Sequence, residues 1–192
     1  MLLQRMSDIL KIAKLMRLCR FAWMASRTLM ALAFVAWVFV GCAVVSPGTT
    51  ELEGKPVPWS RLMLLDGSQI PLTPDAGKMH VVLFWATWCP RSRYVVEDYE
   101  RLAHQFDGKS HLSFFAVSID KNDDFETLKG RIDSQGLHSI QHCFSGNDVQ
   151  DEAFLHFKGH TIPFVVVIDP QGIVRVVTPH VGEVEGFLSA RE

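Results

Sequence analysis

From Trp59 onward, apolar and polar residues follow one another in short segments, and each segment predicts a strand or a helix. Val81–Trp85 is a run of β-branched and aromatic residues, which is typical of a buried central strand. Arg93–Asp107 follows with apolar residues at helical spacing, so we expect a helix there. The short segment Trp88-Cys89-Pro90 joins this strand to this helix.

The rest of the chain continues with the same alternation. Trp59–Leu65 and Gln69–Leu72 predict a leading hairpin, because the dipeptide Asp66-Gly67 between them is a turn signal. After the first helix we expect a strand, a helix, a strand, a helix, a closing hairpin and a short helix. Their ranges are His111–Ile119, Asp124–Gln135, Ile140–Phe144, Asp148–Lys158, Val165–Ile168 with Ile173–Val177, and Val181–Ala190. This order predicts an α/β fold with a central mixed sheet and helices on both faces.

The first fifty residues differ in kind from the rest. Met1–Arg27 is rich in Lys and Arg, whereas Leu29–Val45 is uncharged and reaches the lower limit of the about 17–25 residues that span a bilayer. The positive-inside rule then puts the N-terminus in the cytoplasm and the remainder across the membrane. We expect a basic segment at 1–27, one N-terminal hydrophobic helix at 28–45 as transmembrane anchor or signal segment, a linker at 46–58 and one domain at 59–192.

The sequence leaves open whether segment 28–45 stays attached to the domain. Val40-Gly41-Cys42 resembles the end of a bacterial lipobox, which would make Cys42 a lipidation site after cleavage. The alternatives are an uncleaved anchor, a lipoprotein signal, a cleaved signal peptide and an organelle transit peptide. An anchor predicts a membrane-attached protein whose domain lies on the periplasmic or extracytoplasmic side.

Composition and charge narrow the classes of function. The 192 residues hold one domain of about 130–140 residues besides the N-terminal segment. A net charge of −2 gives no large basic surface, so nucleic acid is not an expected partner. The four cysteines and eight histidines are scattered, so we expect neither a metal nor a cofactor. His138 and His142 are four residues apart, but we interpret them as solvated loop histidines.

The chemistry of the chain centres on Cys89, where the predicted strand meets the predicted helix. Pro90 falls at the first helical position, where its missing N–H costs nothing. The unpaired N–H groups and the dipole at that helix end favour a thiolate over a thiol. Arg91 and Arg93 add positive charge, and Trp88 partly covers the sulfur. The alternative is a buried structural cysteine, but this combination favours a nucleophile.

Trp88-Cys89-Pro90 and Thr161-Ile162-Pro163-Phe164 together resemble the two signature segments of the thioredoxin superfamily. The longer spacing between them resembles the TlpA/ResA-like branch of membrane-tethered thiol-disulfide oxidoreductases, over roughly Pro56 to the C-terminus. The resemblance implies a thioredoxin-like fold in which Cys89 is the attacking cysteine and Pro163 is a cis-proline beside it. The residues that it implies as substrate-binding are Trp88, Pro90, Arg91 and Ile162.

The sequence departs from this family at the fourth motif position. Ser92 stands where the resolving cysteine is expected, and Val95 and Glu97 stand where the branch often has a glutamate and a proline. We therefore predict chemistry by a single cysteine, whose mixed disulfide an external thiol donor must release. Ser92 is retained as a candidate catalytic residue, because its hydroxyl can donate a hydrogen bond to the Cys89 thiolate.

Cys143 is the one other cysteine in the domain that could resolve a mixed disulfide. It lies toward the end of its predicted strand, where active-site loops of α/β sheets gather. The alternative is a small buried hydrophobic residue, which is how a free cysteine usually behaves.

Three functions follow from these patterns. The first is a thioredoxin-like exchange protein of isomerase or deglutathionylation type, an oxidoreductase that acts on disulfide-bonded or glutathionylated client proteins. The second is a non-catalytic binding module, whose groove beside Cys89 and Pro163 holds a client without turnover. The third is a peroxiredoxin-like peroxidase that forms a sulfenic acid. Peroxiredoxins usually have Thr and Pro where this chain has Ala86 and Val82, which argues against the third.

Overall fold

The computed structural model of the chain describes residues 50–58, 60–72 and 77–191. The segments predicted at 1–27 and 28–45 lie outside these ranges, as does Cys42, so the N-terminal helix stays a prediction. Among the described residues, no helix combines the length and the apolar character needed to cross a membrane.

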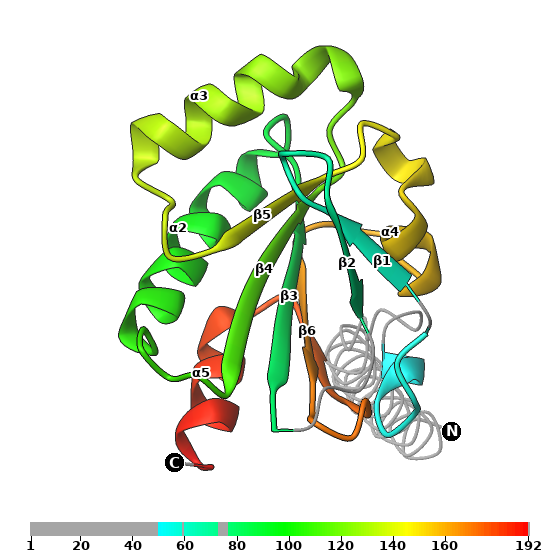
Figure 1. Ribbon diagram of the computed structural model, residues 1–192, viewed down its shortest axis with the longest axis vertical. Coiled ribbons are helices and arrows are strands. Elements are labelled where there is room, and N and C mark those ends of the chain that lie inside the picture. The colour runs from blue at the N-terminus through cyan, green and yellow to red at the C-terminus, as the bar shows by residue number, and fades with distance from the viewer. Residues whose placement is uncertain (1–49, 59, 73–76, 192) are drawn as a thin grey trace, which may run out of the picture. The chain divides into compact units, whose positions relative to one another are not determined.

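A five-stranded mixed sheet with strand order β5-β4-β3-β6-β7 forms the centre of the domain (Figure 1). β3, β4 and β5 are parallel, β6 is antiparallel to β3, and β7 is antiparallel to β6. A hairpin of β1 (Ser60–Met63) and β2 (Gln69–Leu72) precedes it. The sheet strands are β3 (Met79–Trp85), β4 (Leu112–Ser118), β5 (Gln141–Phe144), β6 (Phe164–Ile168) and β7 (Val174–Thr178). The mixed sheet and the leading hairpin confirm the prediction.

Helices cover both faces of this sheet, as predicted. α2 (Pro90–Gln105), α3 (Phe125–Gln135) and α5 (Val181–Ser189) pack on one face, together with alternate residues of β3 such as Leu83. The other face carries the 3-10 helix η1 (Thr50–Leu52), the β1–β2 hairpin and α4 (Glu152–His156), packed with β3 residues such as Phe84. β3 is therefore buried on both sides, which explains its continuous apolar sequence.

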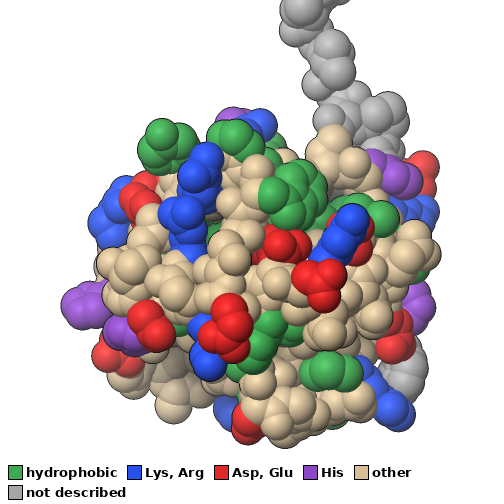
Figure 2. Space-filling model, turned by 90° about the horizontal axis from the view of Figure 1, so that it is seen from above, with side chains coloured by type: hydrophobic (Ala, Val, Ile, Leu, Met, Phe, Trp, Pro, Cys, Tyr) green, Lys and Arg blue, Asp and Glu red, His purple; other side chains and the backbone are tan. Residues whose placement is uncertain are grey.

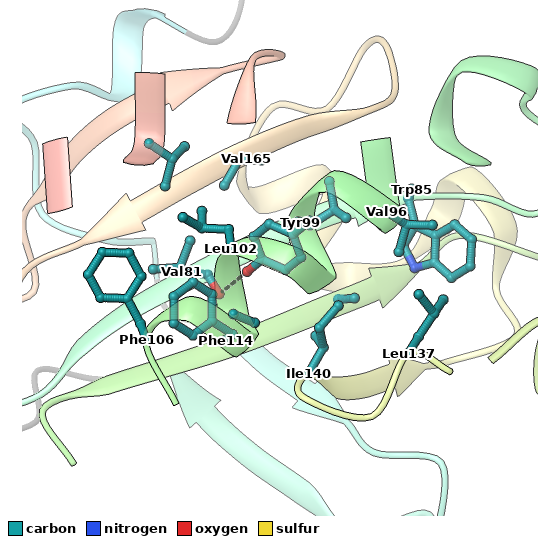
Figure 3. Close-up of a cluster of buried hydrophobic side chains, with 14 of the residues drawn as sticks. Val81, Trp85, Val96, Tyr99, Leu102, Phe106, Phe114, Leu137, Ile140 and Val165 are labelled. Carbon is teal, nitrogen blue, oxygen red and sulfur yellow. Dashed lines mark hydrogen bonds between the residues drawn. The ribbon is translucent and has the colours of Figure 1, made fainter. Parts of the chain in front are cut away.

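A buried tyrosine fixes α2 to the sheet (Figure 3). The Tyr99 hydroxyl donates a hydrogen bond to the Val81 carbonyl oxygen at 2.8 Å, and it lies 3.1 Å from the Phe115 carbonyl oxygen. A phenol that is buried in this way needs such a partner, since an unpaired hydroxyl would be costly. Because Val81 belongs to β3 and Phe115 to β4, this contact sets the position of the helix that follows Cys89.

The helix predicted at Asp148–Lys158 is broken into two pieces. A 3-10 helix, η3 (Asp148–Gln150), is followed by the short α4, with Asp151 between them at φ −54° and ψ 131°. The Asp151 carboxylate accepts a hydrogen bond from the Phe154 N–H at 2.9 Å. Asp competes with helical hydrogen bonds and is favoured at a helix N-cap, so it starts a new helix here instead of continuing the first.

The predicted linker at 46–58 is described from Thr50 onward, and this part packs on β7. The Gly54 N–H donates to the Val174 carbonyl oxygen at 2.8 Å, and the Val174 N–H donates to the Lys55 carbonyl oxygen at 2.9 Å. The Leu52 side chain is buried in the core on the η1 face. Residues 50–58 thus contribute contacts to the folded domain.

Candidate functional site

Cys89 occupies the N-cap of α2, directly after β3, with extended backbone angles of φ −84° and ψ 115°. Its carbonyl oxygen accepts the Arg93 N–H at 3.3 Å, which closes the first turn, and Pro90 takes the first helical position as predicted. The half-buried Cys89 sulfur lies 3.9 Å from the Ile162 carbonyl oxygen. The first N–H groups of a helix lack intrahelical partners, so a negative charge is favoured at this position.

The two signature segments come together in space. The Ile162–Pro163 peptide bond is cis, and Pro163 is buried at the entry to β6. Ile162 and Cys89 both pack against the apolar cluster around Phe84. Residues 73 apart in sequence therefore form one site, and the cis-proline is confirmed.

The predicted substrate-binding residues are divided between the pocket beside Cys89 and the surrounding surface. Trp88 and Ile162 line that pocket. Pro90 and Arg91 are exposed on the first turn of α2 and are not among its lining residues.

Ser92 is fully buried one helical turn after Cys89. Its hydroxyl has no hydrogen-bond partner among the described residues, so the expected bond to Cys89 is not formed here. An unpaired buried hydroxyl costs about 1–3 kcal/mol. Ser92 therefore keeps a free donor close to the reactive sulfur.

Asp120 is the site residue that the sequence analysis missed. It is fully buried directly after β4, and its carboxylate accepts the Thr87 N–H at 3.0 and 3.1 Å and the Thr87 hydroxyl at 2.8 Å. The Ser118 hydroxyl also donates to it in a short bond. Asp120 therefore holds the backbone two residues before Cys89. A signal was present, because a polar residue at the carboxyl end of a buried parallel strand lies at the functional edge of such sheets.

The two positions where the family's acid and proline are absent have other roles. Val95 is half-buried and packs against the core of α2, α3 and α5. Glu97 accepts a short hydrogen bond from the Gln135 side chain, which links α2 to α3. The buried acid of this site is thus Asp120, on a different strand.

Cys143 on β5 is buried, and both it and Cys89 are free thiols. Burial, with a smaller contribution from the nearby Asp151 charge, raises the pKa of Cys143 from 9.0 to about 12. A thiol that stays protonated at neutral pH is a poor nucleophile. The environment favours the small buried hydrophobic residue and gives no support to the resolving role.

We expect Cys143 to lower the stability of the fold at alkaline pH. The unfolded thiol releases its proton above pH 9, whereas the folded thiol holds it until a pH of about 12. Its stabilising contribution is therefore complete below pH 9 and falls by about 1.4 kcal/mol per pH unit within this window. Urea unfolding of wild type and Cys143→Ala at about pH 9 and about pH 11 measures this difference in slope. Parallel slopes would contradict the prediction.

His142, interpreted as a solvated loop residue, is buried on β5 instead. One of its ring nitrogens, Nε2, lies 2.8 Å from the Leu137 carbonyl oxygen, and burial lowers the pKa of the ring. The strand register turns this side chain inward, which local sequence does not reveal. His138 is exposed, as expected. No cluster of His, Cys, Asp or Glu suited to a metal occurs within the described part of the chain.

A pocket of about 560 Å³ opens beside Cys89. Its walls come from the Cys89 loop, the end of β4, η3, α4 and the loop before Pro163. Of the four large hydrophobic side chains exposed among the described residues, three line this pocket: Trp88 at 55%, Val149 at 44% and Leu155 at 49%. Seen from above, exposed hydrophobic side chains gather on this face of the molecule (Figure 2). The break at Asp151 places Val149 and Leu155 on successive short helices of one wall.

We expect Gly159→Ala to destabilise the fold and disturb this wall. A Cβ at Gly159 would overlap the buried Phe154 ring, so the ring must shift, and overpacking costs about 1–3 kcal/mol. Gly130→Ala is the matched control, because no atom lies within 4 Å of its added Cβ in α3. Helix propensity predicts that this control stabilises by about 0.5–1 kcal/mol. Thermal unfolding checks both, and a shift of the same sign would contradict the prediction.

Comparison of the sequence with protein families places residues 77–174, just over half of the chain, in the family described as "Thioredoxin-like". The match begins before β3 and ends at the start of β7, so it includes Cys89, Asp120 and Pro163. No curated protein matches the sequence at a significant level.

Solved structures share the fold at low sequence identity. A thiol-disulfide oxidoreductase from Bacteroides fragilis superposes with a TM-score of 0.65 at 17% identity, covering 72% of this chain and all of its own. A putative protein disulfide isomerase from Bacteroides thetaiotaomicron gives 0.62 at 18% identity, covering 71% of this chain and 87% of its own. A secreted Mycobacterium tuberculosis disulfide oxidoreductase, homologous to E. coli DsbE, gives 0.55 at 14%, covering 68% and 95%.

Proposed function

This chain belongs to the thioredoxin-like family, and from that premise we propose that it is a thiol-disulfide exchange protein with one nucleophilic cysteine, Cys89. The observation that carries the proposal is the placement of this cysteine. It caps α2, lines a pocket, and lies 3.9 Å from the Ile162 carbonyl oxygen beside the cis-proline.

The reaction needs two exchanges, because this site contributes one sulfur. The Cys89 thiolate attacks one sulfur of a client disulfide or glutathione adduct, forms a new S–S bond and expels the other sulfur as a thiolate. An external thiol donor then attacks the mixed disulfide and restores Cys89. Neither exchange changes the total number of disulfides, which suits isomerase or deglutathionylation chemistry.

The surrounding residues support this chemistry without taking part in the bond changes. The buried Ser92 hydroxyl has no other partner and is free to donate to a developing thiolate. Asp120 holds the Thr87 backbone, and so fixes the loop that carries the nucleophile. The Ile162 backbone offers a hydrogen-bonding edge to an extended client segment.

Trapping of covalent adducts tests the proposal. The full-length protein, incubated with oxidised glutathione or a disulfide-bonded client, is expected to form a persistent mixed disulfide that mass spectrometry maps to Cys89. Cys89→Ser should form none, Cys143→Ser should behave as wild type, and an added thiol should clear the adduct. Failure of Cys89 to form any adduct between about pH 6 and pH 8 would favour the non-catalytic binding module.

We also propose that the protein acts at a membrane, with its domain on the periplasmic or extracytoplasmic side. The uncharged stretch at 29–45 and its basic leader support this location. The full-length protein should then resist carbonate extraction, and protease added to the outer side should remove the domain. Recovery as a soluble cytosolic species would overturn this location.

A further inference from the structure

We propose that the pocket beside Cys89 binds a bulky apolar side chain next to the reacting cysteine of a client polypeptide. This inference rests on the exchange function proposed above and identifies its substrate as a protein disulfide, in preference to a glutathione adduct. The apolar side chains that form the pocket are Trp88, Val149, Phe154, Leu155 and Ile162, with Ile119 at its base.

The first argument is the position of the exposed apolar surface. Trp88, Val149 and Leu155 are each about half exposed, on three separate segments that converge on one pocket. Soluble proteins seldom gather exposed apolar side chains in one place without a binding role. Cys89 lines the same pocket, so a client sulfur in contact with Cys89 brings its neighbouring side chains into this space.

The second argument is charge. Glutathione carries two carboxylates and no apolar side chain, so a site built for it would offer cationic partners. None of the described residues that line the pocket is Lys, Arg, Asp or Glu, and His160 is the only histidine there. The lysines that flank these segments already have acidic partners, since Lys158 pairs with Glu51 at 2.6 Å and Lys121 with Asp148 at 3.8 Å.

The third argument is that the fold keeps this pocket open. Gly159 lies against the Phe154 ring, where any larger residue would overlap it. The N-cap at Asp151 starts α4 where it does, which presents Leu155 at the surface while Phe154 remains in the core. The pocket is therefore formed by ordered backbone and exists before a client arrives, which reduces the entropy lost on binding.

Exchange kinetics with defined probes test the inference. The full-length protein is mixed with three disulfides of 5-thio-2-nitrobenzoate, made with acetyl-Phe-Cys-Phe-amide, acetyl-Ser-Cys-Ser-amide and glutathione. Cys89 forms a bond to the peptide or glutathione sulfur, the S–S bond to nitrobenzoate breaks, and the coloured thiolate leaves. Mass spectrometry verifies the adduct, and each rate is divided by that of free N-acetylcysteine with the same probe.

We expect the normalised rate for the Phe peptide to exceed that for the Ser peptide and for glutathione by about tenfold, as partial burial of one large apolar side chain predicts. Leu155→Ser and Val149→Ser should each reduce this ratio, and their combination should bring it close to one. Tyr94→Ser is the matched control, since Tyr94 is 73% exposed on α2 and does not line the pocket.

The outcomes separate this inference from the function on which it rests. Equal rates for all three probes, or a faster rate for glutathione, would overturn the inference and leave the exchange function standing. No adduct with any probe would remove the exchange function itself. A concentration-dependent dimer that Leu155→Ser abolishes, and that excludes the Phe peptide, would make the pocket a contact between copies and also overturn the inference.

Discussion

Replacement of Asp120 by alanine is expected to destabilise the domain by about 2–4 kcal/mol and to slow reaction at Cys89 about tenfold or more. The substitution leaves the Thr87 N–H, the Thr87 hydroxyl and the Ser118 hydroxyl without their acceptor in a dry interior. Each buried donor that loses its partner costs about 1–3 kcal/mol, and a small cavity adds to the loss. The loop that ends in Cys89 then loses the contact that fixes it against β4.

Two further variants make this test specific. Asp120→Asn keeps one acceptor oxygen and the side-chain volume, so it should lose less stability than the alanine variant. Asp123→Ala removes an exposed acid from the turn that follows, and surface changes of this kind stay within about 0.5 kcal/mol. Urea unfolding and the iodoacetamide reaction rate of Cys89 at neutral pH give the readouts. Equal effects of Asp120→Ala and Asp123→Ala would refute the role assigned to Asp120.

Ser92→Cys is expected to convert the site from one thiol to two. Ser92 is buried and its hydroxyl has no partner among the described residues, so the exchange loses no hydrogen bond. Residues three apart on a helix have Cβ atoms about 5–6 Å apart, and the extended backbone at Cys89 leaves room for adjustment to disulfide geometry. The introduced thiol can then attack the mixed disulfide and release the reduced client.

The predicted result is measurable disulfide-reductase activity with a suitable electron donor, where the wild type shows none. We expect only partial activity, because Val95 and Glu97 do not supply the acid and the proline common in the TlpA/ResA-like branch. Ser92→Ala is the control, since it removes the hydroxyl and adds no thiol. If Ser92→Cys folds, forms the disulfide with Cys89 and still reduces nothing, the binding-module function becomes the better explanation.

Local patterns were sufficient for the elements that carry Cys89. The run at Val81–Trp85 and the helical spacing at Arg93–Asp107 reflect burial, which the choice of side chains records directly. Pro163 was identified as well, because a proline before a strand restricts the backbone wherever it occurs. The helix at Asp148–Lys158 was wrong because the Asp151 cap overrides its apolar spacing.

The parts of the site that escaped prediction depend on contacts between distant segments. Asp120 lies 33 residues from Thr87, and its role exists only because β4 pairs in register beside β3. The apolar pocket draws on four segments, so none of its walls is visible in one stretch of sequence. His142 was misplaced for the same reason, since the register of β5 decides which side chains turn inward.

Both outer strands of the central sheet are covered, and this bears on how the protein behaves at high concentration. Leu64, beyond the end of β1, forms a bridge with Cys143 on β5, and Pro56 forms one with Ile173 just before β7. Uncovered strand edges are templates on which other chains can add strands and grow into aggregates. A client that pairs with the Ile162 backbone therefore finds little competing edge elsewhere on this sheet, and partly unfolded clients have few places from which to seed fibrils.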